Sequence, residues 1–294
     1  MRGQCMAGGA AMARSGSEDT LARGSFVRVL RAEALKSRHG APVRLAIVLA
    51  LPFPLLAAFV ALSVPQFGLS YSPWNYWYAL LMPVSITLIA ATVANADARL
   101  GNHTLLSSGV PLHLAWGAKV AWCLALLLLS NLVVFAVYAV MSLVVPQGAA
   151  SMSAMLAVAL ALTVMGSWMI PATHFLTMRV GMLAGVFVPL AVQLALSLGW
   201  SVVPFWPACP PAATIVLPTA FLPVLPSGEP ASPGMALVES ISQGPDVVLA
   251  LIVAAVIVFS YITLGGLSAA IYNEVLQFFV IVAALLPLTL VGLH

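Results

Sequence analysis

Few residues of this chain have the type and spacing that catalysis needs. The sequence contains no GxxxxGK[ST] phosphate loop, no HExxH zinc motif and no GxSxG nucleophile. Its histidines are isolated, and each is predicted to have a surface or interface role: His39, His103, His113, His174 and His294. Cys5, Cys123 and Cys209 form no CxxC or His-Cys cluster, which predicts neither a metal site nor a disulfide framework. We therefore expect no enzyme activity and no cofactor bound by this chain.

The composition indicates a membrane protein. It has 294 residues, of which 62% are hydrophobic and only 6% are charged, whereas a soluble domain has about 25% charged residues. Such a chain needs lipid as its solvent, and continuous apolar runs favour helices over an alternating β-barrel. The sequence predicts an all-α polytopic membrane protein with about six or seven spans, at about 45–64, 77–96, 120–144, 154–176, 180–203, 246–264 and 275–293.

The basic residues predict the orientation. Eight of the eleven Lys and Arg precede residue 45, which favours a juxtamembrane segment over a nucleic-acid-binding tail, and we expect no nucleic-acid partner. With the N-terminus in the cytoplasm, Arg99, Lys119 and Arg179 also fall on the cytoplasmic side of the first five spans. The loops at 65–76, 145–153 and 204–245 contain no Lys or Arg. The sequence predicts a multi-pass protein of a bacterial plasma membrane.

Four segments follow from these patterns. Residues 1–24 are predicted to be a disordered tail, and residues 25–43 an interfacial amphipathic helix with Val27, Leu30 and Ala34 on one face. A solvated basic linker is the alternative for this second segment. Residues 44–245 form the main membrane domain, and residues 246–294 a C-terminal segment of two spans. Pro-rich residues 204–245 predict short broken or re-entrant pieces.

Weaker patterns concern packing. The aromatic residues that open the second span suit a lipid headgroup belt: Trp74, Tyr76, Trp77 and Tyr78. Gly181 and Gly185 are a small-xxx-small pair that allows close helix packing.

The connection between the second and third spans, residues 97–119, is the longest on the cytoplasmic side. It is either a docking surface for a soluble partner or a simple loop. Its candidate contact residues are Asp97, Arg99, His103, Leu105, Leu106, Pro111 and Lys119. The middles of the first five spans contain only mild polar groups and no charge, which argues against a proton or ion pathway there. They suit a permease for an amphipathic or lipid-like substrate, or one that a partner energises.

Residues 25–230 resemble ABC-2 type permeases, especially the lantibiotic-immunity branch. The resemblance rests on FVRVLRAEALK at residues 26–36, on WNYWY at the start of the second span, on the segment from Gly109 to Lys119, and on WMIP at 168–171 before Arg179. It implies a six-helix subunit that forms a homo- or heterodimer and expels antimicrobial peptides. It also implies a separate P-loop ATPase that binds ATP and Mg and docks on residues 97–119.

Residues 259–294 instead resemble a segment of the sodium:solute symporters, through the run from Tyr261 to Gln277. The residues that carry this motif are Gly265, Gly266, Tyr272, Glu274 and Gln277. A symporter needs about ten helices around broken-helix ion sites, more than this sequence contains. The alternatives to an exporter subunit are therefore a truncated symporter, a hybrid of the two families, or a membrane protein that transports nothing.

Overall fold

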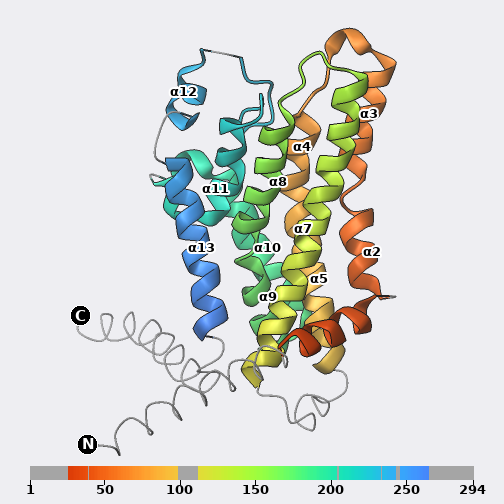
Figure 1. The fold of residues 1–294 in the computed structure, drawn as a ribbon. Coiled ribbons are helices and arrows are strands. Elements are labelled where there is room, and N and C mark those ends of the chain that lie inside the picture. Colours follow the sequence, from red (N-terminus) through yellow and green to blue (C-terminus); the bar gives the residue numbers. More distant parts are fainter. Residues whose placement is uncertain are drawn as a thin grey trace, which may run out of the picture.

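The computed structural model describes residues 26–38, 40–98, 112–203, 205–232, 234–242 and 246–264. These residues form a bundle of roughly parallel helices (Figure 1). Four helical segments are long and apolar enough to cross a membrane: Ala41–Ser63, Ser72–Ala96, Leu114–Val144 and Met152–Arg179. Two shorter apolar helices, Met182–Leu198 and Asp246–Ile257, lie beside them. The prediction of an all-α polytopic membrane protein is confirmed, whereas the seventh predicted span, about 275–293, lies outside the described residues.

The first span is two helices instead of one. Helix α2 (Ala41–Val48) and helix α3 (Pro52–Ser63) are separated at Leu49 to Leu51. Pro52 has no N–H to donate to the preceding turn, and Pro54 follows two residues later. The helical pattern of backbone hydrogen bonds is therefore interrupted, and a new helix begins at Pro52. Most of α3 faces outward, with Phe59 70% exposed, as expected of a helix in contact with lipid.

The second span contains a π-helical turn. Helix α4 (Ser72–Tyr76) continues through η2 (Trp77–Leu81) into α5 (Met82–Ala98). The backbone N–H of Met82 donates to the carbonyl of Trp77, the i→i+5 pattern of a π-turn. Pro83 comes directly after it and cannot donate to the previous turn, which explains why the regular ladder is interrupted here. Helix α5 then packs against α2 and against four further helices described below.

The third and fourth spans lie side by side. Helix α7 (Leu112–Val144) is the longest described helix, and it packs along α8 (Met152–Gly166). Ser151 caps α8 by accepting a hydrogen bond from the backbone N–H of Ala154. After a short turn the fourth span continues as α9 (Met169–Arg179). Pro171 prevents a regular helical ladder across this turn.

Helices α9 and α10 (Met182–Leu198) form a tight hairpin. Gly181 makes the turn with a φ of 126°, a backbone conformation that favours glycine. A Cβ at Gly185 would lie 2.9 Å from the backbone N of Thr177 and 3.0 Å from the carbonyl oxygen of Thr173. The predicted close packing is confirmed for Gly185 and is wrong for Gly181, where an added Cβ would meet no atom within 4 Å and the glycine makes the turn instead.

The segment after α10 forms short pieces at one end of the bundle. They comprise three short 3₁₀ helices, α11 (Pro210–Val216) and α12 (Ala236–Ser242), before α13 (Asp246–Leu264) returns along the bundle (Figure 1). Every residue of α11 is buried. The prediction of short broken pieces is therefore confirmed, and α11 sits inside the protein body.

The aromatic residues of the second span are core residues, so their predicted place in a headgroup belt is wrong. Trp74, Trp77 and Tyr78 are 0% exposed, and only Tyr76 is exposed, at 44%. The ring of Tyr138 on α7 lies 4.6 Å from Trp74 and 5.2 Å from Tyr71, between ring centroids. These rings join the second and third spans, because aromatic side chains bury large areas when they stack.

Two ends of the bundle can be distinguished by charge. Arg44, Lys119 and Arg179 lie toward one end, here named the basic end. A helix over residues 26–37, here named the basic helix, crosses this end and leads into α2 (Figure 1). Short pieces α11 and α12 lie toward the opposite end. The cytoplasmic location of the basic end stays a prediction, and it agrees with the positive-inside rule.

Candidate functional site

A buried salt bridge fixes the basic helix to the bundle. The Nζ atom of Lys119 on α7 lies 3.3 Å from an Oε atom of Glu33, and their side chains are only 6% and 7% exposed. Lys36, one helical turn after Glu33, donates to the other Oε atom at 2.9 Å with its side chain 49% exposed. One carboxylate is therefore held between a buried and a half-exposed ammonium. We name Glu33, Lys36 and Lys119 the ionic clamp.

The periodicity of the basic helix explains why Glu33 is buried. Residues Phe26, Val29, Leu30, Glu33 and Ser37 follow helical spacing, and all are buried or half-buried. The Ser37 hydroxyl donates to the carbonyl oxygen of Glu33 at 2.7 Å, inside the same interface. The predicted apolar face was partly wrong, because Leu30 and Ala34 turn inward but Val27 is 62% exposed.

A second polar pair lies directly behind the clamp. Cys123 is one turn beyond Lys119 on α7, and its Sγ atom lies 3.5 Å from Nε2 of His174 on α9. Cys123 is 2% exposed and His174 is 1% exposed. The predicted surface or interface role of His174 is therefore corrected, since its side chain is buried inside the bundle. No group of three or more metal-binding side chains is present among the described residues.

The predicted docking residues fall into three groups. Asp97 lies in the last turn of α5, which extends to Ala98. Arg99, His103, Leu105, Leu106 and Pro111 lie outside the described residues. Lys119 is inside α7, because this helix begins at Leu112, eight residues before the expected start of the third span. The expected loop position of Lys119 is thus wrong, and its side chain contacts Glu33. Its role in docking a partner stays a prediction.

The residues of the symporter-like motif also lie outside the described chain. Gly265, Gly266, Tyr272, Glu274 and Gln277 all follow the last described residue of α13. Their predicted role stays a prediction.

Polar side chains inside the spans are linked to one another. The indole N–H of Trp77 donates to Oδ1 of Asn131 at 3.1 Å, and the Asn131 amide donates to Oγ1 of Thr163 at 3.1 Å. This chain joins the second, third and fourth spans at depth. Trp168 likewise donates to Gln193 at 3.1 Å, tying the fourth span to α10. Because these groups have partners on neighbouring helices, they contribute to helix packing.

Four other mild polar groups of the spans also have partners, on their own helix or on a neighbouring one. Thr87 and Thr92 donate to carbonyl oxygens of their own helix. Ser130 donates to the carbonyl oxygen of Ala46 at 2.8 Å, which joins α7 to α2. Asn95 contacts the sulfur of Met182. None of these contacts resembles a coordination shell for an ion.

An apolar groove opens between α10 and α13. Its volume is about 410 Å³, within the range of small-molecule sites. Trp168, Val192, Pro210, Pro211, Val256, Ile257 and Ser260 line it. Val192 and Val256 are also 42% and 57% exposed, so the groove lies on the lipid-facing surface of the protein. Its chemistry suits an apolar chain better than an ion.

Comparison with known proteins found no matching family model, no matching curated protein and no matching solved structure. The described residues define the class to which the chain belongs: an all-α membrane protein with several membrane-spanning helices. The function must be inferred from the site itself.

Sequence reasoning missed the ionic clamp, although its signal was present. Glu33 is the only acidic residue between residues 20 and 96, a stretch that contains six Lys and Arg residues. A lone carboxylate in such a segment is expected to find a cationic partner when it is buried. The partner itself, Lys119, lies 86 positions away and was assigned to a loop.

Proposed function

We propose that this chain is the membrane-spanning permease subunit of an ATP-driven exporter of ABC-2 type in a bacterial plasma membrane. A separate P-loop ATPase that carries ATP and Mg supplies the energy, and two permease subunits, identical or different, form the transporter. Following the resemblance to the lantibiotic-immunity branch, we propose antimicrobial peptides as the substrate class.

The ionic clamp is the observation that carries this proposal. Glu33 and Lys119 tie the basic helix to the start of the third span, and residues 99–111 immediately precede that span. A partner bound to residues 97–111 therefore acts on α7, and through the salt bridge on the basic helix that leads into the first span. A buried salt bridge is suited to couple these two helices, because breaking it by removing one partner is strongly unfavourable in free energy.

Two features of the membrane body support the proposal. The first five predicted spans have no charged residue in their middle, so ion coupling within them lacks its usual groups. The apolar groove beside α13 and the outward apolar faces suit an amphipathic substrate that enters from lipid.

Affinity purification tests the proposal. The tagged chain is extracted from its native membrane in mild detergent, and the co-purifying proteins are identified. We expect a P-loop ATPase in stoichiometric amount, lost when residues 103–107 are scrambled and kept when residues 226–232 at the opposite end are scrambled. Sodium-dependent uptake by the chain alone, without an ATPase, would support the truncated symporter instead.

A further inference from the structure

The basic helix has a second face that the ionic clamp leaves exposed. Val27, Arg31, Leu35 and Arg38 all lie on this face, within an arc of about 80° at the helical repeat of 3.6 residues per turn. Val27 and Leu35 are 62% and 58% exposed, and both arginines are exposed. We name these four residues the outer stripe. It is opposite the face that packs on the bundle.

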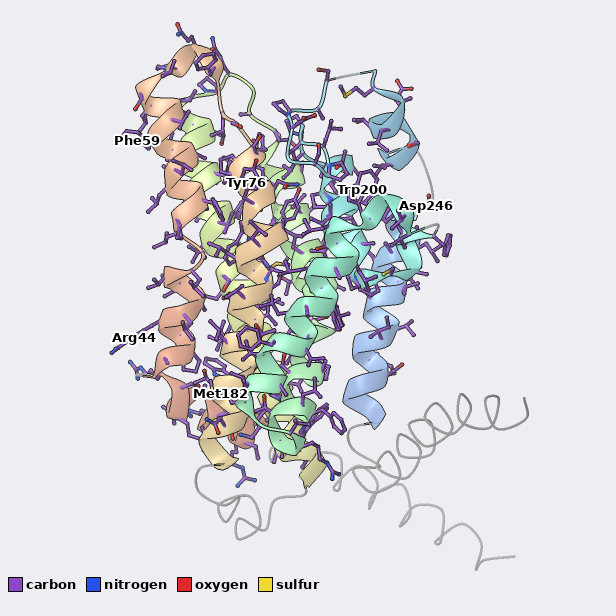
Figure 2. The ribbon with its side chains drawn as sticks, turned by 180° about the vertical axis from the view of Figure 1, so that it is seen from behind. Arg44, Phe59, Tyr76, Met182, Trp200 and Asp246 are labelled. Carbon is purple, nitrogen blue, oxygen red and sulfur yellow. The ribbon has the colours of Figure 1, made fainter. Side chains whose placement is uncertain are left out.

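The ionic clamp determines the charge of this surface. Glu33 is the only carboxylate of residues 25–43, and it is turned inward, where Lys119 and Lys36 contact it. Every exposed charge on the basic helix is therefore cationic. Arg44 on α2 extends the cationic surface, and Figure 2 shows its side chain pointing away from the bundle.

The alternation of apolar and basic side chains suits a lipid headgroup region. Arg31 and Arg38 are two turns apart, about 10.5 Å along the axis, and Leu35 lies between them. Exposed apolar side chains on a helix that runs along a membrane surface insert among acyl chains, while arginines bind phosphates in a bidentate manner. An acidic protein surface would satisfy the arginines but offers less to Val27 and Leu35.

We infer that the outer stripe, together with Arg44, binds the headgroups of anionic phospholipids and concentrates them beside the first span. This surface would act in any membrane protein with this fold, so it does not depend on the proposed transport function. The clamp contributes by removing the one negative charge that would repel such lipids. Each Lys or Arg near an anionic surface favours binding by about fivefold.

Fluorescence quenching by brominated lipids tests this inference. A fluorophore is attached to Leu35→Cys in a background with Cys5→Ser and Cys209→Ser, and Cys123 stays because it is buried. The protein is reconstituted in vesicles that contain equal amounts of phosphatidylglycerol and phosphatidylcholine, with one of the two brominated. We expect stronger quenching by brominated phosphatidylglycerol, and a loss of this preference by about tenfold or more in R31Q/R38Q, since two cations are removed.

A matched reporter controls for the fold and for bulk lipid. Phe59→Cys places the fluorophore on α3 at the opposite end, at a site 70% exposed, and should show equal quenching by both lipids in every variant. Equal quenching at Leu35→Cys, or a preference that survives in R31Q/R38Q, overturns the inference. A preference abolished by inorganic phosphate at constant ionic strength assigns the surface to soluble anions. A reporter that neither lipid quenches means that a protein partner or solvent covers the stripe, and it overturns the inference too.

Discussion

Removing Glu33 should destabilise the protein more than removing Lys119, although the two form one salt bridge. The asymmetry follows from Lys36. When Lys119→Met removes the buried ammonium, Glu33 keeps the contact with Lys36 at 2.9 Å, and methionine fills the space with an apolar chain. When Glu33→Gln removes the carboxylate, two contacts are lost at once, the one with Lys119 at 3.3 Å and the one with Lys36 at 2.9 Å.

The magnitudes follow from the burial of the two groups. Breaking a buried ion pair by removing one partner costs about 3–5 kcal/mol, and we expect Glu33→Gln to fall in this range. We expect a smaller loss, about 1–2 kcal/mol, for Lys119→Met, because only one of the two contacts of the carboxylate is lost and an apolar side chain takes the place of the ammonium. The double variant should cost less than the sum, with a coupling energy of about 1–3 kcal/mol.

Unfolding in mixed micelles of sodium dodecyl sulfate measures these energies through the fluorescence of the buried tryptophans. Lys36→Gln is the matched control, since Lys36 is 49% exposed and its pair should contribute about 1 kcal/mol or less. The thiol reactivity of Ser37→Cys, in the background without Cys5 and Cys209, reports whether the basic helix stays docked. Equal costs for the two single variants, with additive effects in the double variant, would refute the idea that one carboxylate serves both lysines.

Three further predictions concern packing inside the bundle. Gly185→Val should lower the free energy of unfolding by about 2 kcal/mol or more, because the larger side chain overpacks against the α9 backbone. Gly117→Ala is the control: its new Cβ meets only a ring carbon at 3.7 Å, so the variant should be neutral or stabilising in the same unfolding assay. Asn131→Leu should lower the free energy of unfolding by about 1–2 kcal/mol, because it breaks the hydrogen bonds to two other spans. Thr163→Val breaks only one of these bonds and should have a smaller effect; equal effects would contradict this order. Burial raises the pKa of Tyr71 above its ordinary value, so the neutral phenol stabilises the fold below pH 10 and this contribution is lost as the pH rises further. The stability difference between wild type and Tyr71→Phe should therefore be full at neutral pH and shrink above pH 10, and a difference that grows there would contradict the sign.

Hydropathy predicted where most helices lie but not which faces of them are buried. The span predicted at 246–264 coincides with α13, and the pieces predicted in the Pro-rich segment are present. Lipid and protein interior are both apolar, so a run such as WNYWY looks the same in either environment. This is why Trp74 and Trp77 were expected at the lipid surface although they lie in the core.

The candidate site was less predictable, because it depends on contacts between distant residues. Position 119 was predicted to end a loop, since Gly109 and Pro111 disfavour a helix in the preceding residues. The helix nevertheless begins at Leu112, and this brings Lys119 one turn below Cys123 and within reach of Glu33. No periodicity within one segment reveals such a pair. The break at Pro52, by contrast, follows directly from the missing N–H of proline.

The central claim is that a partner ATPase drives this chain, and ATP hydrolysis in a reconstituted bilayer tests it most directly. The ATPase that co-purifies is assayed alone, with the wild-type chain, and with the chain scrambled at residues 103–107. We predict that the wild-type chain stimulates hydrolysis, that the scrambled chain does not, and that scrambling residues 226–232 has no effect. Hydrolysis that is the same with and without the chain, or stimulation that survives scrambling of residues 103–107, would contradict the account.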